Sequence, residues 1–277
     1  MMKVITRILA GGIILAAYFT PAQPVSFEIV SNTSAPGSAA SNAPAVAAVI
    51  PAPPRPNTAI IPQLNRGFLR QHTNNVEVAK KDDIDLLFMG DSITDWWRNS
   101  GRGTGTNGAI PYGGKAVFEK YFGAMKVANF GIAGDTTQGV LFRLRDGEGE
   151  GYKPKAIMLM IGTNNTGGNS PPEIAMGVAD VVFELRKDFP DAKILLLAIF
   201  PRDRANSSVR AKITEINKII AALHDNRHVF FMDIGPKFLA EDGSIPRDIM
   251  SDGLHPTNKG YEIWAEAVHD TLASLMQ

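Results

Sequence analysis

Five short apolar segments, separated by longer amphipathic stretches, constrain most strongly what this chain can fold into. Each segment is almost continuously hydrophobic, as parallel strands are when helices cover both faces of their sheet. Five repeats of strand and helix predict one doubly wound α/β domain with a five-stranded parallel sheet. The predicted strands are residues 84–89, 125–130, 155–161, 193–199 and 228–233.

Three of the other stretches are predicted to be helices. Residues 171–189 begin with two prolines, which favour a helix start, and then repeat apolar residues at helical spacing. Residues 207–225 repeat them in the same way, and residues 257–276 form the last predicted helix. Ligands of such sheets bind beyond the carboxyl ends of the strands, so the polar residues found there are the first candidates for a functional site.

Residues 1–22 are typical of a secretory signal peptide. Lys3 and Arg7 precede an apolar run at residues 8–19, and small residues that suit cleavage follow it. The run is shorter than the roughly 20 residues that a membrane-spanning helix needs, so no stable membrane span is expected after cleavage. The sequence thus predicts a secreted or periplasmic protein, with an uncleaved anchor as the alternative.

Residues 23–58 are rich in Ala, Pro and Ser, and they separate this leader from the periodic part of the chain. Such a composition cannot bury enough apolar surface to offset the entropy of ordering, so we predict a disordered linker. A recognition segment for a partner is the alternative. The folded domain is then expected at residues 59–277.

Charge and cysteine content exclude several classes of function. The chain has 28 basic and 28 acidic residues, so its formal net charge is zero. A nucleic-acid partner is therefore not expected, because binding to phosphate backbones needs a clustered positive charge. The absence of cysteine excludes disulfides, thiol catalysis and cysteine zinc sites.

Four short polar blocks stand at strand ends or at the start of the last helix. They are Gly90–Thr94, Asn129–Asp135 and Gly162–Asn165 after the first three strands, and Asp252–Pro256 before the final helix. Each block alone is what a turn uses for positive φ angles and helix capping. All four together indicate a functional site.

The blocks contain the residues that ester hydrolysis by a serine requires. Ser92 is a candidate nucleophile, and His255 is the candidate base that takes its proton. Asp252 lies three residues before His255, and in a turn this spacing brings its carboxylate beside the imidazole. A plain helix cap is the competing interpretation for both Ser92 and Asp252.

Hydrolysis also needs hydrogen-bond donors aimed at the oxyanion that forms. The backbone N–H of Ser92, at a helix start, is one candidate. The N–H of Gly134 is a second, because no side chain obstructs it, and the side-chain amide of Asn164 is a third. These donors are neutral, so they would stabilise a developing negative charge without binding a resting anion too tightly.

On these residues the chain resembles the GDSL, or SGNH, hydrolase family, which is named for a Ser, Gly, Asn and His in four blocks. Ser92, Gly134, Asn164 and His255 stand in the family's order, and the resemblance covers about residues 80–277. The stretches NFGIAGDTTQGVLFRL and GTNN most resemble the catalytic subunits of intracellular platelet-activating-factor acetylhydrolases and their bacterial relatives. The resemblance implies a flavodoxin-like three-layer α/β/α sandwich, with the folded domain as the catalytic domain.

The resemblance also implies a role for each of these residues. Ser92 would be the nucleophile, His255 the general base and acid, and Asp252 its partner. The N–H groups of Ser92 and Gly134 and the side chain of Asn164 would form the oxyanion hole. Hydrolysis would run through an acyl-enzyme, without a metal or other cofactor.

Residues near the blocks are candidates for substrate contact. Trp96 and Trp97 follow Ser92 by about one helical turn, where stacking on a sugar and packing against the sheet are the two interpretations. Asn165 is a further candidate contact, with support of its own loop as the alternative. The Gly-rich stretch 100–114 is longer than in compact family members and is expected to form a mobile loop beside the site.

Several other residues are expected to be structural. Trp264 is predicted to lie in the core, Asp91 and Asp135 to serve turns and helix starts, and Asn129 to support the second block. Four further histidines have no Asp in a comparable turn, so they are expected to be solvated or to cap helices: His72, His224, His228 and His269.

Together these features predict a secreted serine esterase that removes short acyl groups, above all acetyl, from an alcohol. A carbohydrate ester, as a small molecule or a polysaccharide, is the leading substrate. A thioesterase or lysophospholipase of the same fold is the alternative enzyme, and a catalytically silent carbohydrate-binding module is the alternative of another class. The intact Ser92, His255 and Asn164 argue against the silent module. The sequence leaves the oligomeric state open.

Overall fold

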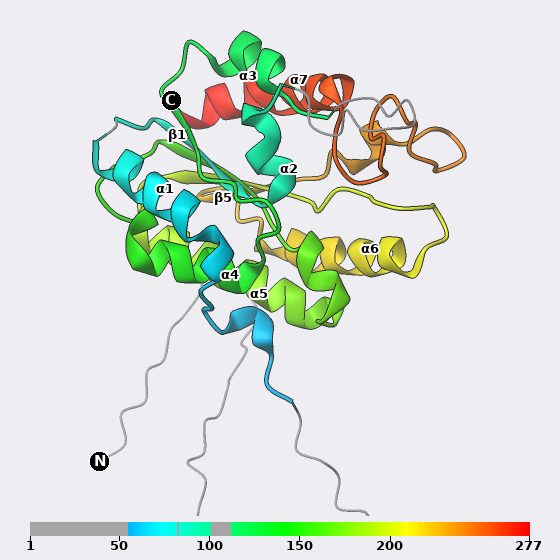
Figure 1. Cartoon of the computed structure of the whole chain (residues 1–277), viewed down its shortest axis with the longest axis horizontal. Coiled ribbons are helices and arrows are strands. Elements are labelled where there is room, and N and C mark those ends of the chain that lie inside the picture. Colours follow the sequence, from blue (N-terminus) through cyan, green and yellow to red (C-terminus); the bar gives the residue numbers. More distant parts are fainter. Residues whose placement is uncertain (1–54, 82, 101–111) are drawn as a thin grey trace, which may run out of the picture. The chain divides into compact units, whose positions relative to one another are not determined.

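The computed structural model describes residues 55–81, 83–100 and 112–277 of the chain. Five parallel strands form one sheet in the order β2-β1-β3-β4-β5 (Figure 1). This is the strand order of flavodoxin-like folds, so the predicted fold class is confirmed. Each strand overlaps a predicted one: β1 (Leu86–Gly90), β2 (Val127–Asn129), β3 (Ala156–Met160), β4 (Lys193–Leu197) and β5 (Val229–Met232).

Helices cover both faces of the sheet, which makes three layers (Figure 1). One face carries α1 (Leu69–Lys81), α4 (Thr137–Arg143), α5 (Pro171–Asp188) and α6 (Ser208–Ile220), and the other carries α3 (Lys115–Phe122) and α7 (Asn258–Leu275). The short helix α2 (Ser92–Asp95) directly follows β1. Single helical turns, of 3-10 type except for the π-turn η4, are η1 (Thr58–Ile60), η2 (Arg66–Phe68), η3 (Trp96–Arg98), η4 (Leu144–Glu148), η5 (Thr163–Gly167), η6 (Ala221–Leu223) and η7 (Gly235–Phe238).

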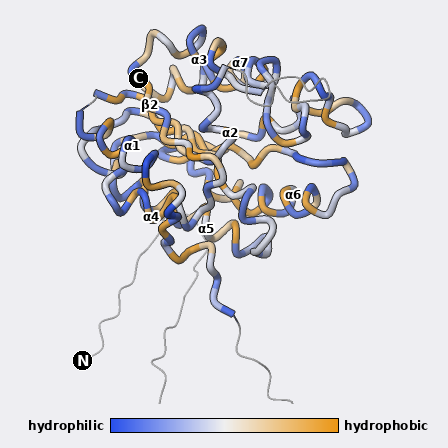
Figure 2. Tube along the Cα trace, viewed as in Figure 1, coloured by the Kyte–Doolittle hydropathy of each residue, from blue (hydrophilic) through white to orange (hydrophobic). Residues whose placement is uncertain are grey.

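The sheet separates two hydrophobic cores. Successive side chains of a strand point to opposite faces, so Leu87 and Met89 of β1 pack with α4 and α5, whereas Leu86 and Phe88 pack with α3 and α7. Every residue of β1 and β3 is buried, as expected for strands that helices cover on both faces. Figure 2 shows hydrophobic residues concentrated in the sheet between the helix layers.

Caps at the helix starts explain where the three predicted amphipathic helices begin. The Glu173 carboxylate accepts hydrogen bonds from the N–H and the hydroxyl of Ser170, just before α5 starts at Pro171. The side chains of Ser207 and Thr257 cap α6 and α7 by accepting backbone N–H groups of the first turn. All three helices therefore form within their predicted ranges.

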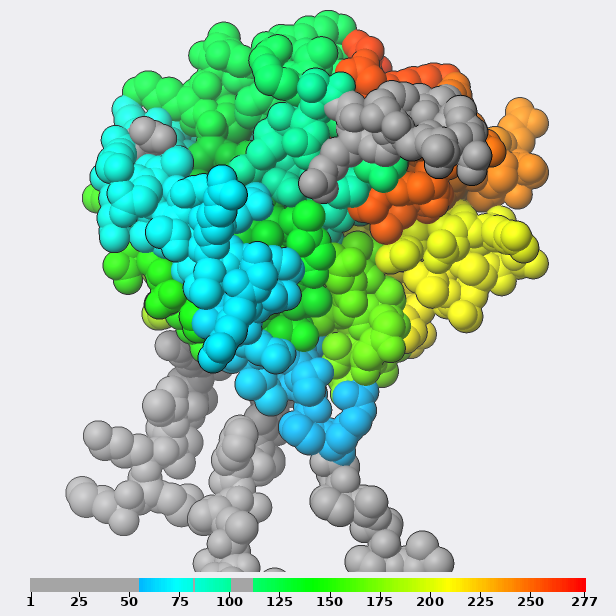
Figure 3. All heavy atoms as spheres, viewed as in Figure 1, coloured from blue at the N-terminus to red at the C-terminus, as the bar shows by residue number. Residues whose placement is uncertain are grey.

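The folded domain begins a few residues earlier than the sequence predicted. Asn57 caps η1 by accepting the N–H of Ala59, and Arg55 forms an ion pair with Glu173 of α5. The linker prediction is therefore wrong for residues 55–58, because composition does not reveal these side-chain contacts. In Figure 3 this blue segment lies against the yellow-green atoms of α5. The predicted signal peptide and the rest of the linker lie outside the described residues.

The Gly-rich stretch 100–114 also falls largely outside the described residues, which resume at Tyr112. Tyr112 forms an isolated antiparallel bridge with Thr257, at the start of α7, and Gly114 then precedes α3.

Among the helices of the described ranges, none is long and apolar enough to cross a membrane.

Gly90, the last residue of β1, has no room for a side chain. A Cβ atom there would overlap the carbonyl oxygen of Met160 in the neighbouring strand β3 and the hydroxyl of Thr94. The glycine therefore lets the end of β1 lie close to β3, just before the first polar block.

We expect Gly90→Ala to lower the free energy of unfolding by about 1–3 kcal/mol, because the added methyl group would push β1 away from a backbone carbonyl. Gly167→Ala is the matched control. No atom lies within 4 Å of a Cβ at Gly167, so we expect a change of at most about 0.5 kcal/mol. Urea unfolding measures both variants, and equal stability of the two would contradict the close approach.

Candidate active site

Ser92 is the first residue of α2, directly after β1. Its neighbour Asp91 caps this short helix, because the Asp91 carboxylate accepts the N–H of Ile93 at 3.0 Å. The Ser92 hydroxyl instead lies 2.9 Å from the His255 imidazole, measured from Oγ to Nε2. The competing interpretation of Ser92 as the helix cap is therefore wrong.

His255 lies in the turn that precedes α7. Its Nδ1 is 2.6 Å from Oδ2 of Asp252, while its Nε2 faces Ser92. The other oxygen of Asp252 accepts the N–H of Leu254 at 2.9 Å and the N–H of His255 at 2.7 Å. The residue that caps α7 is Thr257, so Asp252 is not the helix cap. The Asp252 carboxylate instead fixes the turn and the orientation of the imidazole.

Hydrogen bonding keeps the Asp252 carboxylate ionised beside the imidazole. Partial burial raises the pKa of Asp252, but the hydrogen bonds from the side chain and N–H of His255 lower it by more, so the net pKa lies below its ordinary value. An ionised carboxylate at Nδ1 stabilises the imidazolium that forms when Nε2 takes a proton. The arrangement can therefore remove the hydroxyl proton of Ser92 as its oxygen attacks a carbonyl carbon.

The second and third blocks follow β2 and β3, the strands on either side of β1. Gly134 has a φ angle of 85°, a left-handed value that favours glycine. Asn164 lies in η5, and its Nδ2 donates a hydrogen bond to the carbonyl oxygen of Asp135 at 2.8 Å. That bond uses one of the two hydrogens of the amide, so the other remains for a ligand. The side chain of Asn164 and the Gly134–Asp135 segment are thus joined directly.

Asn129, at the end of β2, supports the second block as predicted. Its Oδ1 accepts the N–H of Gly131, and its Nδ2 donates to the carbonyl oxygen of Thr94, both at 2.9 Å. The two bonds attach the second block to α2, the helix that carries Ser92.

Asn165 does not face a substrate, contrary to the prediction of a contact there. Its side chain is 2% exposed and fully engaged: Oδ1 accepts the N–H of Thr137 at 3.1 Å, and Nδ2 donates to Gln138 at 2.8 Å. The alternative, support of its own loop, describes Asn165 correctly, because these bonds fix the start of α4 against η5.

Trp96 is 7% exposed, so it offers no open face on which a sugar can stack, and that prediction is wrong. Its ring stacks on Tyr112, with centroids 4.9 Å apart, and lies 4.0 Å from the imidazole of His255. Trp96 therefore packs against the histidine instead. Trp97 and Trp264 are buried in the core, with ring centroids 4.9 Å apart, and Trp264 is there as predicted.

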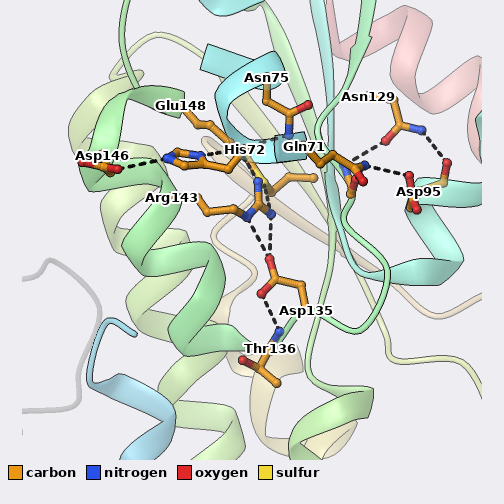
Figure 4. A network of polar contacts seen from close by, with 12 residues as sticks. Gln71, His72, Asn75, Asp95, Asn129, Asp135, Thr136, Arg143, Asp146 and Glu148 are labelled. Carbon is orange, nitrogen blue, oxygen red and sulfur yellow. Dashed lines mark hydrogen bonds and ion pairs between the residues drawn. The ribbon is translucent and has the colours of Figure 1, made fainter. Parts of the chain in front are cut away.

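His72 is buried, although the sequence predicted a solvated or capping residue. Its Nδ1 lies 2.8 Å from Oε1 of Glu148, and its Nε2 lies 3.1 Å from Asp146 (Figure 4). The hydrogen bond with Glu148 raises the pKa of His72, burial lowers it and Asp146 raises it again, for a net increase.

The prediction fits the other three histidines, which are exposed or partly exposed. Within the described ranges, no group of three or more His, Cys, Asp or Glu residues is arranged to bind a metal ion.

Arg143 is the residue that sequence reasoning missed. It is 2% exposed at the end of α4 and forms ion pairs with the fully buried Asp135, at 2.8 Å, and with Glu148. Asp135 therefore does more than serve a turn. A signal for this network was present in the sequence, because the positively charged Arg143 stands among apolar residues that face the core: Val140, Leu141 and Leu144.

Comparison with known proteins connects this geometry to a family and to relatives. The model of the GDSL-like Lipase/Acylhydrolase family matches residues 88–263, a range that contains Ser92 and His255. The platelet-activating factor acetylhydrolase IB subunit alpha2 of Rattus norvegicus is 31% identical over 211 residues, which are 76% of this chain and 85% of that protein.

Solved structures share the fold. A GDSL-like lipase from Bacteroides thetaiotaomicron aligns with a TM-score of 0.57 and 20% identity, over 75% of this chain and 97% of that one. An acetylxylan esterase from Geobacillus stearothermophilus aligns with a TM-score of 0.51 and 21% identity, over 70% of this chain and 94% of that one. At these identities the likeness shows the fold alone.

Asp91 carries a buried carboxyl group whose second oxygen, Oδ2, has no hydrogen-bond partner in the described part of the chain. Burial raises the pKa of Asp91 strongly, the N–H of Ile93 lowers it and the charge of Asp135 raises it, which brings it to about 7. The folded protein therefore keeps a proton on Asp91 at a pH where an unfolded chain has lost it.

We expect this carboxyl group to make folding stability fall as the pH rises from about 4, where Asp titrates in an unfolded chain, to about 7. Asp91→Asn keeps the helix cap and removes the titration. Thermal unfolding across this range measures the effect, and the variant should gain stability relative to the wild type as the pH rises. Parallel curves for the two proteins would show that burial does not shift the titration of Asp91.

Proposed function

This chain belongs to the GDSL-like lipase/acylhydrolase family, and we propose that it is a serine esterase that removes short acyl groups, above all acetyl, from alcohols. The observation that carries the proposal is the line of hydrogen bonds from Ser92 through His255 to Asp252, with distances of 2.9 and 2.6 Å. A nucleophile, a base and a group that orients the base are together within hydrogen-bond reach, as nucleophilic catalysis requires.

In the proposed first half-reaction, Oγ of Ser92 attacks the ester carbonyl carbon while its proton moves to Nε2 of His255. The carbonyl oxygen becomes an oxyanion, which accepts hydrogen bonds from the N–H groups of Ser92 and Gly134 and from the amide of Asn164. When this intermediate collapses, the bond to the alkoxy oxygen breaks, and the imidazolium gives its proton to that oxygen. The alcohol leaves, and the acyl group stays on Ser92.

In the second half-reaction, water takes the place of the alcohol. His255 removes a proton from water as its oxygen attacks the acyl carbonyl, and the same donors bind the second oxyanion. Collapse breaks the bond to Ser92, which regains its proton from His255, and the carboxylic acid leaves. Asp252 stays ionised throughout, so it stabilises the imidazolium in both halves. The cycle consumes one ester and one water.

The relatives support acetyl as the acyl group but differ in the alcohol. One relative is named as an acetylhydrolase of platelet-activating factor, which is an acetylated phospholipid, and one structural neighbour is an acetylxylan esterase. We propose a carbohydrate acetyl ester as the natural substrate and a secreted or periplasmic location, which the signal-peptide pattern at residues 1–22 supports. An acetylated phospholipid is the second candidate, because the relative with 31% identity favours it.

We expect Ser92→Ala to lower kcat on p-nitrophenyl acetate by ~10³-fold or more, because the three residues act as a unit. A fluorophosphonate probe should label the wild type and not the variant. Ser274→Ala, an exposed serine near the end of α7, is the control and should keep wild-type activity. Near-normal activity of Ser92→Ala would overturn the proposal. An unreactive wild type that still binds polysaccharide would favour the silent binding module.

We expect kcat/KM on p-nitrophenyl esters to fall from acetyl to octanoyl, because each methylene group that does not fit an acyl pocket costs about 1–3 kcal/mol. Acetate release from acetylated xylan and from platelet-activating factor, measured side by side, then identifies the alcohol. A higher kcat/KM on octanoyl esters would contradict the acetyl preference and favour the lysophospholipase alternative. A higher kcat/KM on acetyl thioesters would contradict the preference for oxygen esters and favour the thioesterase alternative.

A further inference from the structure

We propose that Arg143 is a positioning residue for the oxyanion hole. Its buried ion pair with Asp135 holds the N–H of Gly134 and the amide of Asn164, the two donors that α2 does not supply, where they can bind the oxyanion. The inference rests on the proposed esterase reaction. Arg143 touches neither the nucleophile nor its base, so its effect on the reaction is indirect, and Asp135 is the partner that joins Arg143 to both donors.

Asp135 is the point where the two donors meet. It follows Gly134 directly in the chain, and its carbonyl oxygen accepts the Nδ2–H of Asn164 at 2.8 Å. One oxygen of its carboxylate accepts the N–H of Thr136 at 2.8 Å, which leaves the other oxygen, Oδ2, for Arg143. A shift of Asp135 would therefore move the peptide of Gly134 and the side chain of Asn164 together.

Arg143 holds Asp135 from the interior of the protein. Its Nε and Nη2 lie 2.9 and 2.8 Å from Oδ2 of Asp135, and its Nη1 bonds to Glu148 (Figure 4). Its Nη2 also lies 3.6 Å from the sulfur of Met89, which is in β1, three residues before Ser92. The guanidinium group thus lies between β1, the strand that leads to Ser92, and the loop that carries Gly134.

The far side of the guanidinium group is fixed as well. Glu148 is fully buried, and its Oε1 lies 2.8 Å from Nδ1 of His72 and 3.2 Å from Nδ2 of Asn75, both on α1. The π-turn η4 brings Glu148 back to Arg143, and Gly147 makes this path possible with a φ angle of 108°. Figure 4 shows Arg143 between Asp135 on one side and Glu148 with His72 on the other.

The burial of these charges favours a positioning role over a purely stabilising one. Burial raises the pKa of Asp135, and the charge of Arg143 counteracts that rise. A buried ion pair is weak evidence for stability, because the cost of removing both charges from water offsets much of their attraction. Its geometry is nevertheless sharply defined, and donors in an oxyanion hole need such definition, since a displacement of about 1 Å can cost ~10²-fold in rate.

The chain offers a matched control two residues away. Arg145, on η4, forms an ion pair with the buried Glu184 of α5 at 2.8 Å, and this pair makes no contact with Asp135 or Asn164. Arg143→Lys and Arg145→Lys are the same chemical change. Lysine keeps the charge and loses the planar fork that binds two groups at fixed angles.

We expect Arg143→Lys to lower kcat on p-nitrophenyl acetate by about tenfold or more with KM within about twofold, because the lost interaction acts in the transition state. A trifluoromethyl ketone, which forms a hemiketal oxyanion with Ser92, should have a Ki that rises by the same factor as kcat/KM falls. Ki does not depend on the fraction of protein that is folded, so a merely structural defect would leave it unchanged. Arg145→Lys should keep both quantities within about twofold.

Double variants test whether Arg143 acts through the donors. Arg143→Lys combined with Asn164→Ala should lose less activity than the product of the two single losses, because both act on one interaction. Asp135→Asn, which keeps the size of the side chain and removes the ion pair, replaces Arg143→Lys if the latter does not fold.

The outcomes separate this inference from the proposed function. A wild type whose activity does not depend on Ser92 would refute the proposed function itself. An active, Ser92-dependent wild type with unchanged kcat and Ki in Arg143→Lys or Asp135→Asn would refute only the positioning role. Strictly multiplicative losses in the double variant would refute it as well.

Discussion

The pairing of β1 between β2 and β3 is the constraint on which the rest of this structure depends. Parallel pairing of three neighbouring strands brings the loops that follow them to one edge of the sheet, and these loops carry Ser92, Gly134 and Asn164. Gly90 permits the close approach at that edge, because any side chain there would overlap the backbone of β3. The remaining groups, Asp252 and His255, come from a turn that reaches the same edge because α7 packs against the α3 side of the sheet.

The surroundings of Ser92 are stabilised by different interactions on the two faces of the sheet. On the side of α3 and α7, aromatic packing dominates: Trp96 lies against the imidazole of His255, and the rings of Trp97 and Tyr261 have centroids 4.5 Å apart. On the side of α1 and α4, buried charge dominates, through Arg143 and its partners. Apolar packing has no preferred direction, whereas charge-assisted hydrogen bonds fix angles as well as distances. Two of the three proposed oxyanion donors, the N–H of Gly134 and the amide of Asn164, are connected to this buried charge through Asp135.

Sequence reasoning failed where distant parts of the chain set the surroundings of a side chain. The sequence predicts a solvated or capping His72, but Glu148, 76 residues later, holds it in the interior. Trp96 follows Ser92 at the spacing of a substrate platform, but its packing against Tyr112 and His255 buries it. Composition misplaced residues 55–58 for the same reason, since their contacts with α5 lie more than 100 residues away in the chain.

The sequence by itself determined the alternation of five buried strands with helices and the strand-end positions of the four polar blocks, because hydrophobic periodicity and turn chemistry are local properties. The three-residue spacing of Asp252 and His255 is local too, which is why their contact was predictable. Only the tertiary structure decided that Asp91 caps α2 while Ser92 faces His255. It also decided that Asn164 forms a hydrogen bond with Asp135 and that Arg143 forms an ion pair with the same Asp135. Burial and pairing of polar groups depend on which segments the fold brings into contact, and no local pattern of residues specifies that.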